Sequence, residues 1–173
     1  MSVDAQTQDA SSNDQGIGGA TIMTADAQML VTMRVDQQLF GIPVQYVRDV
    51  LKEQNMARVP LSPPEIEGSI NLRGRIVTVI NVRARLKLES KEDAQQQMFV
   101  VVESENELYS LMVDDVGDVM NIPHVQIEKT PANMAPNWRE VASGIHRLES
   151  ELLVIIDPET LLTLTHPNEE NTL

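Results

Sequence analysis

The sequence predicts an all-β protein with short helices, arranged as two similar small β-barrels that pack against each other. Its 173 residues are 42 % hydrophobic but only 3 % aromatic, so aliphatic side chains supply the core of one domain or two small ones. Short apolar segments recur between turn residues, which is typical of barrels and sandwiches. In addition, one strand-rich unit occurs twice, which favours two barrels of the same kind.

Most of the expected elements are strands. Residues 30–35 alternate between apolar and polar, a turn begins at Asp36, and residues 39–42 return, so these segments are expected to form a hairpin. Residues 75–81 and 98–102 are dense in β-branched or large apolar side chains, which favours central strands. Further strands are expected at residues 57–59, 69–72, 108–112, 116–121, 141–147 and 152–156.

Two short helices complete the expected elements. Pro43 fits the first position of a helical segment over residues 44–51, because its fixed φ suits a helix start and the apolar residues that follow share one helix face. Near the C-terminus, residues 159–164 are expected to form a short closing helix. Neither helix changes the all-β class.

An internal repeat is the evidence for two barrels. The segments LFGIPVQYVRDVL from Leu39 and LYSLMVDDVGDVM from Leu108 are identical at five positions without gaps. A second pair follows in the same order, IVTVIN from Ile76 and LLVIID from Leu152, and each ends on an Asx residue suited to cap a helix. Because both pairs keep their order, we interpret them as two copies of one strand-rich unit.

The duplication divides the chain into two barrels and two tails. We expect the first barrel at about residues 28–95 and the second at about residues 96–165. Barrels of roughly 65 residues bury little core alone, so the two are expected to pack together. Residues 1–27 contain four Asp, no Lys or Arg and no apolar periodicity, so they are expected to be a disordered acidic arm. Residues 166–173 form a polar C-terminal tail.

Composition excludes several classes of function. The chain has no Cys, which removes disulfides, thiolate metal sites and thiol nucleophiles together. Nucleic acid is not expected as a partner, because a formal net charge of −13 repels phosphate backbones and the few aromatic residues offer no stacking platform. Neither an export signal nor an apolar run long enough to span a membrane is present, so we expect a cytoplasmic protein without direct membrane insertion.

No enzyme or metal motif is found in the sequence. Phosphate-binding glycine loops, nucleophile elbows and zincin motifs are absent, so no catalytic residue and no cofactor is expected. The histidines (His124, His146 and His166) are scattered, without a second ligand at helical spacing, and no metal role is assigned to them. The acidic residues between positions 114 and 118 lack the alternating oxygen ligands of a calcium loop.

The most distinctive stretch runs from Gly68 to Leu86. Gly74 supplies the permissive backbone of a tight connection between two strands, and this places Arg73 at a strand end with its guanidinium directed outward. Arginine is suited to bidentate pairing with a carboxylate of a partner. An acid of the same chain could hold this side chain instead, and the residues alone leave both readings open.

The same stretch resembles the hallmark segment of the CheW family of bacterial chemotaxis coupling proteins. The matching residues are Gly68, Asn71, Leu72, Arg73, Gly74, Ile76, Val79, Arg83 and Leu86. The resemblance extends from about residue 29 to residue 164. It implies two five-stranded SH3-like barrels, which agrees with the repeat found independently. It also implies a protein without catalytic activity that links the tips of methyl-accepting chemoreceptors to the regulatory domain of the histidine kinase CheA, at the inner face of the membrane.

Carried over by position, the resemblance implies two binding surfaces. The receptor-binding groove between the barrels would include Val47, Asp49, Gly68, Arg73, Ser110 and Val119. The kinase contact would lie in the second barrel, at Glu128, Lys129, Pro131 and Asn133. The family more often has Asp, Leu, Gly, Gly and Glu where this chain has Asn81, Val82, Ser110, Asp115 and Asp49.

One alternative from a different class is weighed against the adaptor. A double β-barrel can also bind a small ligand or catalyse a reaction on an unknown substrate. The scarcity of His, the absence of Cys and the lack of an aromatic-lined site favour the adaptor, because such a chain has few groups with which to do chemistry.

Overall fold

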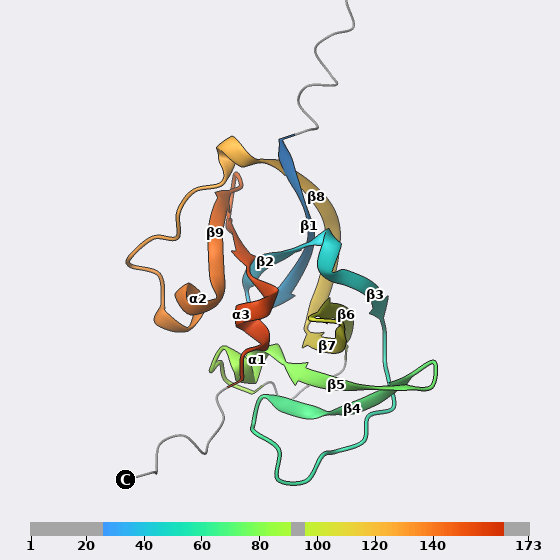
Figure 1. Ribbon diagram of the computed structural model, residues 1–173. Helices are drawn as coiled ribbons and strands as arrows, with labels where there is room; N and C mark the ends of the chain where they lie inside the picture. Colours follow the sequence, from blue (N-terminus) through green and yellow to red (C-terminus); the bar gives the residue numbers. More distant parts are fainter. Residues whose placement is uncertain (1–25, 91–95, 165–173) are drawn as a thin grey trace, which may run out of the picture.

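The computed structural model describes residues 26–90 and 96–164, so almost all of the expected acidic arm and the whole polar tail lie outside the described residues. Within these two ranges the chain forms ten strands, three short α-helices and two 3₁₀ helices (Figure 1). The strands are arranged in two five-stranded sheets. The expectation of an all-β fold with short helices is therefore confirmed.

We call the two sheets the terminal sheet and the central sheet, after the parts of the chain that supply them. The terminal sheet has the strand order β8-β1-β2-β10-β9. Its strands are β1 (Ala27–Val35), β2 (Gln38–Pro43), β8 (Asp115–Pro123), β9 (Ala142–Arg147) and β10 (Leu152–Ile156). The central sheet has the order β3-β6-β7-β5-β4. Its strands are β3 (Val47–Leu51), β4 (Ile66–Leu72), β5 (Arg75–Asn81), β6 (Met98–Ser104) and β7 (Glu107–Val113).

The expected division into barrels at residues 28–95 and 96–165 is wrong, because the two repeats exchange strands. The first two strands of each repeat pair with the last three strands of the other, so β1 and β2 join β8 to β10 while β6 and β7 join β3 to β5. The chain crosses between the sheets through the 3₁₀ helix η1 (Val44–Tyr46) and again at Asp114, between β7 and β8. The repeat shows which segments are alike, whereas pairing depends on contacts between residues far apart in the chain.

The helix expected over residues 44–51 is also wrong. η1 takes only three residues, and β3 then pairs antiparallel with β6. Apolar residues spaced by three and four positions fit one face of a helix, but the β-branched valines among them suit a strand as well, and pairing with β6 decides between the two. Residues 57–59 form no strand, since only Ala57 makes an isolated bridge, to Ser69.

Three short helices follow or precede strands. α1 (Val82–Arg85) follows β5, and α3 (Pro158–Leu162) follows β10. The side chains of Asn81 and Asp157 accept hydrogen bonds from backbone amides of the first turn, at 3.1 and 3.2 Å, as expected of capping residues. α2 (Pro136–Val141) has no counterpart among the expected elements, although proline at its first position is the usual signal of a helix start.

Both sheets contribute to one shared core, which confirms that the two halves pack together. Its buried members are Val31, Met33, Val35, Phe40, Ile42, Ile80, Val82, Leu86, Val100, Val102, Leu111, Val113, Val141, Ile145, Val154, Ile156 and Leu161. Burial of each large aliphatic side chain contributes roughly 1.5–3 kcal/mol relative to exposure, so this core holds the sheets together. Each sheet also has a smaller buried cluster of its own. The one in the terminal sheet includes Leu153, and the one in the central sheet includes Val79.

Candidate functional site

Arg73 occupies the two-residue turn between β4 and β5, at the tip of a hairpin that extends from the central sheet (Figure 1). Leu72 pairs with Arg75, and both residues between them have positive φ, 52° for Arg73 and 84° for Gly74. The amide of Gly74 donates a hydrogen bond to Asn71 Oδ1 at 2.9 Å, which fixes the turn. The expected tight connection is therefore confirmed, and it leaves the Arg73 side chain 86 % exposed.

The backbone of Arg73 is strained at this position. A left-handed conformation is natural for glycine or asparagine, but for other residues it costs about 1 kcal/mol or more. The protein thus has an arginine at a position where glycine or asparagine would give a more stable fold. Strain beside an exposed charged side chain favours a binding role for that side chain.

Asp49 of β3 approaches the guanidinium of Arg73, with Oδ2 of the acid 3.6 Å from Nη2. β3 and β4 are the two edges of the central sheet, so the contact shows that the sheet curls round until its edges approach. Exposed ion pairs contribute only about 0–1 kcal/mol, so the carboxylate of a partner can compete for this guanidinium. An internal acid therefore does lie beside Arg73, while the side chain stays accessible and its pairing with the carboxylate of a partner stays a prediction.

Three of the residues expected to bind a receptor lie in one row across the central sheet. The register aligns Asp49, Val101, Ser110, Val79 and Gly68 on neighbouring strands. Ser110 is fully buried in the middle of this row, and its hydroxyl has no hydrogen-bond partner among the described residues. It therefore lies inside the barrel and does not form part of the surface that a receptor would touch.

Gly68 is also buried, and its lack of a side chain lets the barrel close. A Cβ at this position would lie 2.4 Å from the carbonyl oxygen of Ala57, which is too close for any side chain. The adjacent backbone exchanges two hydrogen bonds between Ala57 and Ser69, at 2.9 and 2.8 Å. Gly144 has the same role in the terminal sheet, where the backbone of Glu128 bridges to β9. Gly68 is thus a buried residue that allows the backbone of Ala57 to approach β4.

Val47 and Val119 lie along the boundary between the two sheets, which we call the seam. Val119 of β8 pairs with Val31 of β1, a member of the shared core, and remains 52 % exposed. Val47 of β3 packs against the same core from the central sheet and is half-buried. The structure therefore places these two valines where the shared core reaches the surface.

Met29 belongs to the same surface and was not expected from the sequence. It lies two residues before Val31 on the same face of β1, and half of its side chain is exposed. The alternation Met29, Val31, Met33, Val35 was the signal that could have found it, because its other three members are buried in the shared core.

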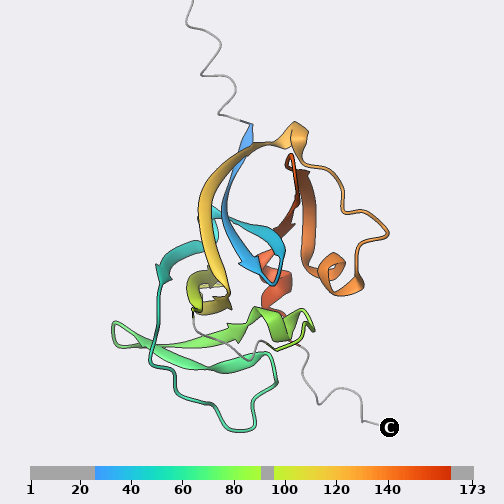
Figure 2. The same ribbon diagram turned by 180° about the vertical axis from the view of Figure 1, so that it is seen from behind.

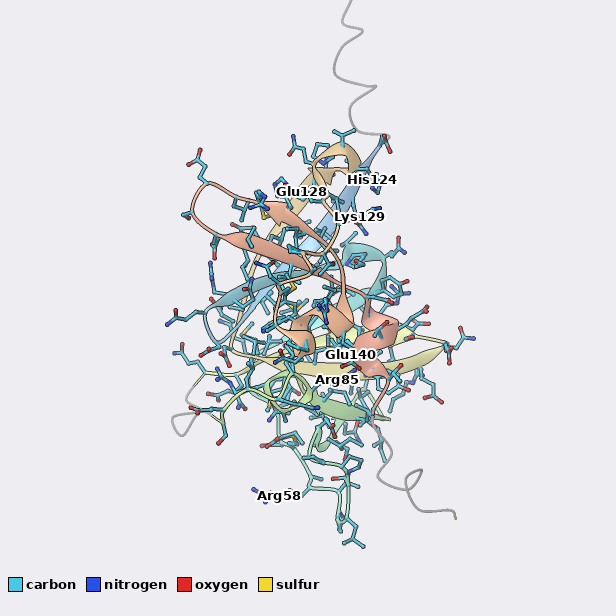
Figure 3. All side chains as sticks on the ribbon, turned by 90° about the vertical axis from the view of Figure 1, so that its left-hand side faces the viewer. Arg58, Arg85, His124, Glu128, Lys129 and Glu140 are labelled. Atoms are coloured by element: carbon cyan, nitrogen blue, oxygen red, sulfur yellow. The ribbon has the colours of Figure 1, made fainter. Side chains whose placement is uncertain are left out.

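The residues expected to contact the kinase follow the 3₁₀ helix η2 (His124–Gln126). Glu128 bridges to Ile145 through two backbone hydrogen bonds of 2.8 and 2.9 Å, and its carboxylate pairs with Arg147 at 3.0 Å. Lys129 is exposed and forms no ion pair with another described residue. Figure 3 shows Glu128 and Lys129 together at one end of the molecule, with Arg58 at the opposite end.

The two remaining residues of this surface, Pro131 and Asn133, lie further along the same segment. Pro131 is half-buried, and its carbonyl accepts a hydrogen bond from the amide of Met134 at 3.2 Å, while Asn133 is exposed. Residues 128–133 therefore form one surface segment in which only the backbone of Glu128 is part of a sheet.

Asp114, one member of the acidic cluster noted in the sequence, has a structural partner. Its carboxylate pairs with Arg83 of α1 and accepts a hydrogen bond from the amide of Asp36 at 2.7 Å. This ion pair lies largely buried at the point where the chain crosses between the sheets. Among residues 26–90 and 96–164, no group of three or more potential metal ligands is found.

One ion pair shifts the pKa of both partners. Arg34 donates two hydrogen bonds to the carboxylate of Glu151, at 2.9 and 2.6 Å. These bonds raise the pKa of Arg34 and lower the pKa of Glu151. The pair connects β1 to the turn before β10 within the terminal sheet.

No helix among the described residues has the length and apolar character needed to cross a membrane.

Comparison with known proteins places this architecture in a family. The sequence matches the CheW-like domain over residues 29–166. The chemotaxis protein CheW of Bacillus subtilis is 29 % identical over 143 residues, which cover 81 % of this chain and 92 % of that protein. The probable chemotaxis protein CheW of Rhizobium etli is 26 % identical over 136 residues, covering 79 % of this chain and 88 % of that protein.

A solved structure supports the same assignment. The crystal structure of the scaffolding protein TtCheW from Thermoanaerobacter tengcongensis has a TM-score of 0.72 and 26 % sequence identity, covering 80 % of this chain and 94 % of that one. The family resemblance noted in the sequence is thereby confirmed, and the alternative of an enzymatic double barrel is set aside. The chain belongs to the CheW-like domain family, a family of non-catalytic chemotaxis coupling proteins.

Proposed function

We propose that this protein couples the tips of chemoreceptors to the regulatory domain of the histidine kinase CheA in a signalling array. The observation that carries the proposal is the seam between the sheets, where apolar side chains are exposed, together with the accessible guanidinium of Arg73 beside β3. Val119 and Met29 are each about half exposed at the seam, and Asp49 links β3 to Arg73 at 3.6 Å. Such a surface suits a receptor segment with an apolar face and a nearby carboxylate.

The kinase is proposed to bind at residues 128–133, on the other side of the molecule. Figures 1 and 2 show the β4–β5 hairpin and the segment between β8 and α2 on opposite sides of the fold. A coupling protein needs two surfaces that can be occupied together, and this separation provides them. Lys129 and Asn133 are exposed and available for contact.

The proposal is tested by titrating the protein with the CheA regulatory domain and with a receptor hairpin fragment, separately and together. We expect two binary complexes and one ternary complex, because the two surfaces do not overlap. Lys129→Glu should weaken only the kinase complex, and Val119→Asp should weaken only the receptor complex. Competition between the two partners for one surface would contradict the proposal.

A further inference from the structure

The three short helices meet between the two sheets, and one buried charged side chain lies at their centre. α1 follows β5 of the central sheet, whereas α2 precedes β9 and α3 follows β10 of the terminal sheet. Arg85 at the end of α1 is only 6 % exposed. Burial of a cation is costly without partners, so its contacts identify what the side chain holds in place.

Arg85 donates hydrogen bonds to two carbonyl oxygens at the end of α3. Nε reaches Leu161 at 2.9 Å, and Nη2 reaches Thr160 at 3.0 Å. Carbonyls in the last turn of a helix lack partners within the helix, and a guanidinium supplies several donors in a fixed plane. Arg85 therefore joins the end of α1 to the end of α3, across the two sheets.

The same guanidinium also faces α2. Oε1 of Glu140 lies 3.6 Å from Nη2, and Figure 3 shows the two side chains next to each other. The residue that follows α1, Leu86, accepts a hydrogen bond through its carbonyl from the side chain of Asn137. The last residue of α1 and the residue that caps it thus each contact one residue of α2.

α2 in turn holds the segment that precedes it. Arg139 donates to the carbonyl of Ala132 at 2.7 Å, and Trp138 packs on Phe40 with ring centroids 6.1 Å apart. Ala132 lies between Pro131 and Asn133 in the proposed kinase surface. A continuous set of contacts therefore runs from Arg85 through α2 to that surface.

We infer that Arg85 is a positioning residue for the kinase surface, acting from the opposite sheet through α2. The inference rests on the proposed function. Outside α2 the segment is held at two points among the described residues, Glu128, which bridges to Ile145, and Met134, which packs against the shared core. Without the contacts of Arg85 and Leu86, α2 keeps Trp138 in the core but loses its attachment to α1. Residues 130–137 would then sample more conformations and bind a partner more weakly.

The test compares Arg85→Met and Asn137→Ala with Arg48→Met in the full chain. Arg48 is the control, because its side chain is exposed and its polar partners are Glu103, at 2.6 Å, and the carbonyl of Gln45, neither of which belongs to α1, α2 or α3. In Arg85→Met we expect amide hydrogen exchange of residues 130–141 to rise about tenfold while exchange in β5 and β10 stays within about twofold of wild type. Kinase-domain affinity should fall about tenfold, and receptor-fragment affinity should change less than about twofold.

Two results would overturn the inference. One is exchange of residues 130–141 that matches the Arg48→Met control. The other is an equal loss of affinity for both partners, which would show that Arg85 only supports global stability. If Arg85→Met does not fold, Asn137→Ala decides by the same criteria, with an expected rise in exchange of about threefold.

Failure of the proposed function is distinguished by Lys129→Glu in the otherwise unchanged protein. If this substitution leaves kinase affinity intact, the kinase does not bind at residues 128–133, and the proposed kinase surface is wrong. The exchange measurement needs no partner, so it still decides whether Arg85 holds α2 and the segment before it.

Discussion

Arg73 and Asp49 lie 3.6 Å apart although they come from the two opposite edge regions of the central sheet. The contact forms only because the sheet curls, and it gives the proposed receptor side both an accessible cation and a nearby acid. The pair is exposed, so it contributes little to stability and leaves Arg73 free to change partners.

Arg73→Glu should weaken receptor binding while the fold is retained. The substitution opens no cavity, and changes at exposed sites usually alter the free energy of unfolding by less than about 0.5 kcal/mol. Repulsion from a receptor carboxylate and from Asp49 should lower receptor-fragment affinity at least about tenfold, with kinase-domain affinity unchanged. Titration of both fragments, with a melting curve as control, checks this. Normal receptor binding by a folded variant would show that the groove lies elsewhere.

Arg73→Asn should separate binding from stability. Asparagine tolerates the positive φ at this position, so the free energy of unfolding should rise by up to about 1 kcal/mol. Receptor affinity should nevertheless fall, because the guanidinium is lost. Urea denaturation and receptor titration of the same sample measure the two effects. A variant that is less stable than wild type would mean that Arg73 is held mainly by its internal partner.

Ser110→Ala should stabilise the protein without affecting either partner. Its hydroxyl is buried and unpaired, and removing such a group recovers a desolvation penalty of about 1 kcal/mol. Ser143→Ala is the control, since the hydroxyl of Ser143 is exposed in part and donates to Ile155 at 3.3 Å. Equilibrium unfolding in urea provides the comparison. A loss of receptor affinity in Ser110→Ala would mean that Ser110 belongs to the binding surface.

Gly68→Ala should destabilise the fold strongly. The added methyl group would lie 2.4 Å from the carbonyl of Ala57 and would force the closing segment away, at a cost of about 2–3 kcal/mol. Gly74→Ala is the matched control, because nothing lies within 4 Å of a Cβ there and only its φ of 84° is unfavourable. Melting temperatures of the two variants test the contrast. Equal effects would mean that the close approach of Ala57 has no energetic weight.

Glu151→Gln should remove part of the acid sensitivity of the protein. Hydrogen bonds from Arg34 hold the pKa of Glu151 below its ordinary value of 4.5, so the pair stabilises the fold above that value and its contribution is lost as the pH falls through the lower folded-state pKa. The Tm of wild type should exceed that of the variant at neutral pH, and the gap should close as the pH falls below the ordinary pKa of 4.5 and through the lower folded-state pKa. A gap that is independent of pH would exclude this carboxylate as its source.

Local sequence patterns predicted two strands whose side chains are mostly buried or half-buried. Residues 75–81 and 152–156 match β5 and β10 at both ends, because dense β-branched and aliphatic runs have no other stable arrangement in so short a segment. The capping roles of Asn81 and Asp157 were predictable for a similar reason, since an Asx side chain acts on amides only two or three residues away.

The errors concern contacts between distant parts of the chain. The exchange of strands between the repeats depends on pairings such as that of β1 with β8. The strand β3 forms because it pairs with β6. No local sequence pattern records either pairing. The same holds for the binding surfaces. Whether Ser110 faces the interior or a partner depends on the register of β7 between β5 and β6, so resemblance by position alone could not separate buried residues from exposed ones.

The strand exchange makes the molecule a stiff mechanical link. A force that pulls the two sheets apart cannot separate them while every strand stays paired. The connections between the sheets, at residues 44–46 and at Asp114, are too short to extend. Separation would require β8 to be stripped from β1, or β3 from β6, with the loss of a ladder of backbone hydrogen bonds at once. Displacement imposed on one barrel is therefore passed to the other as rigid-body movement.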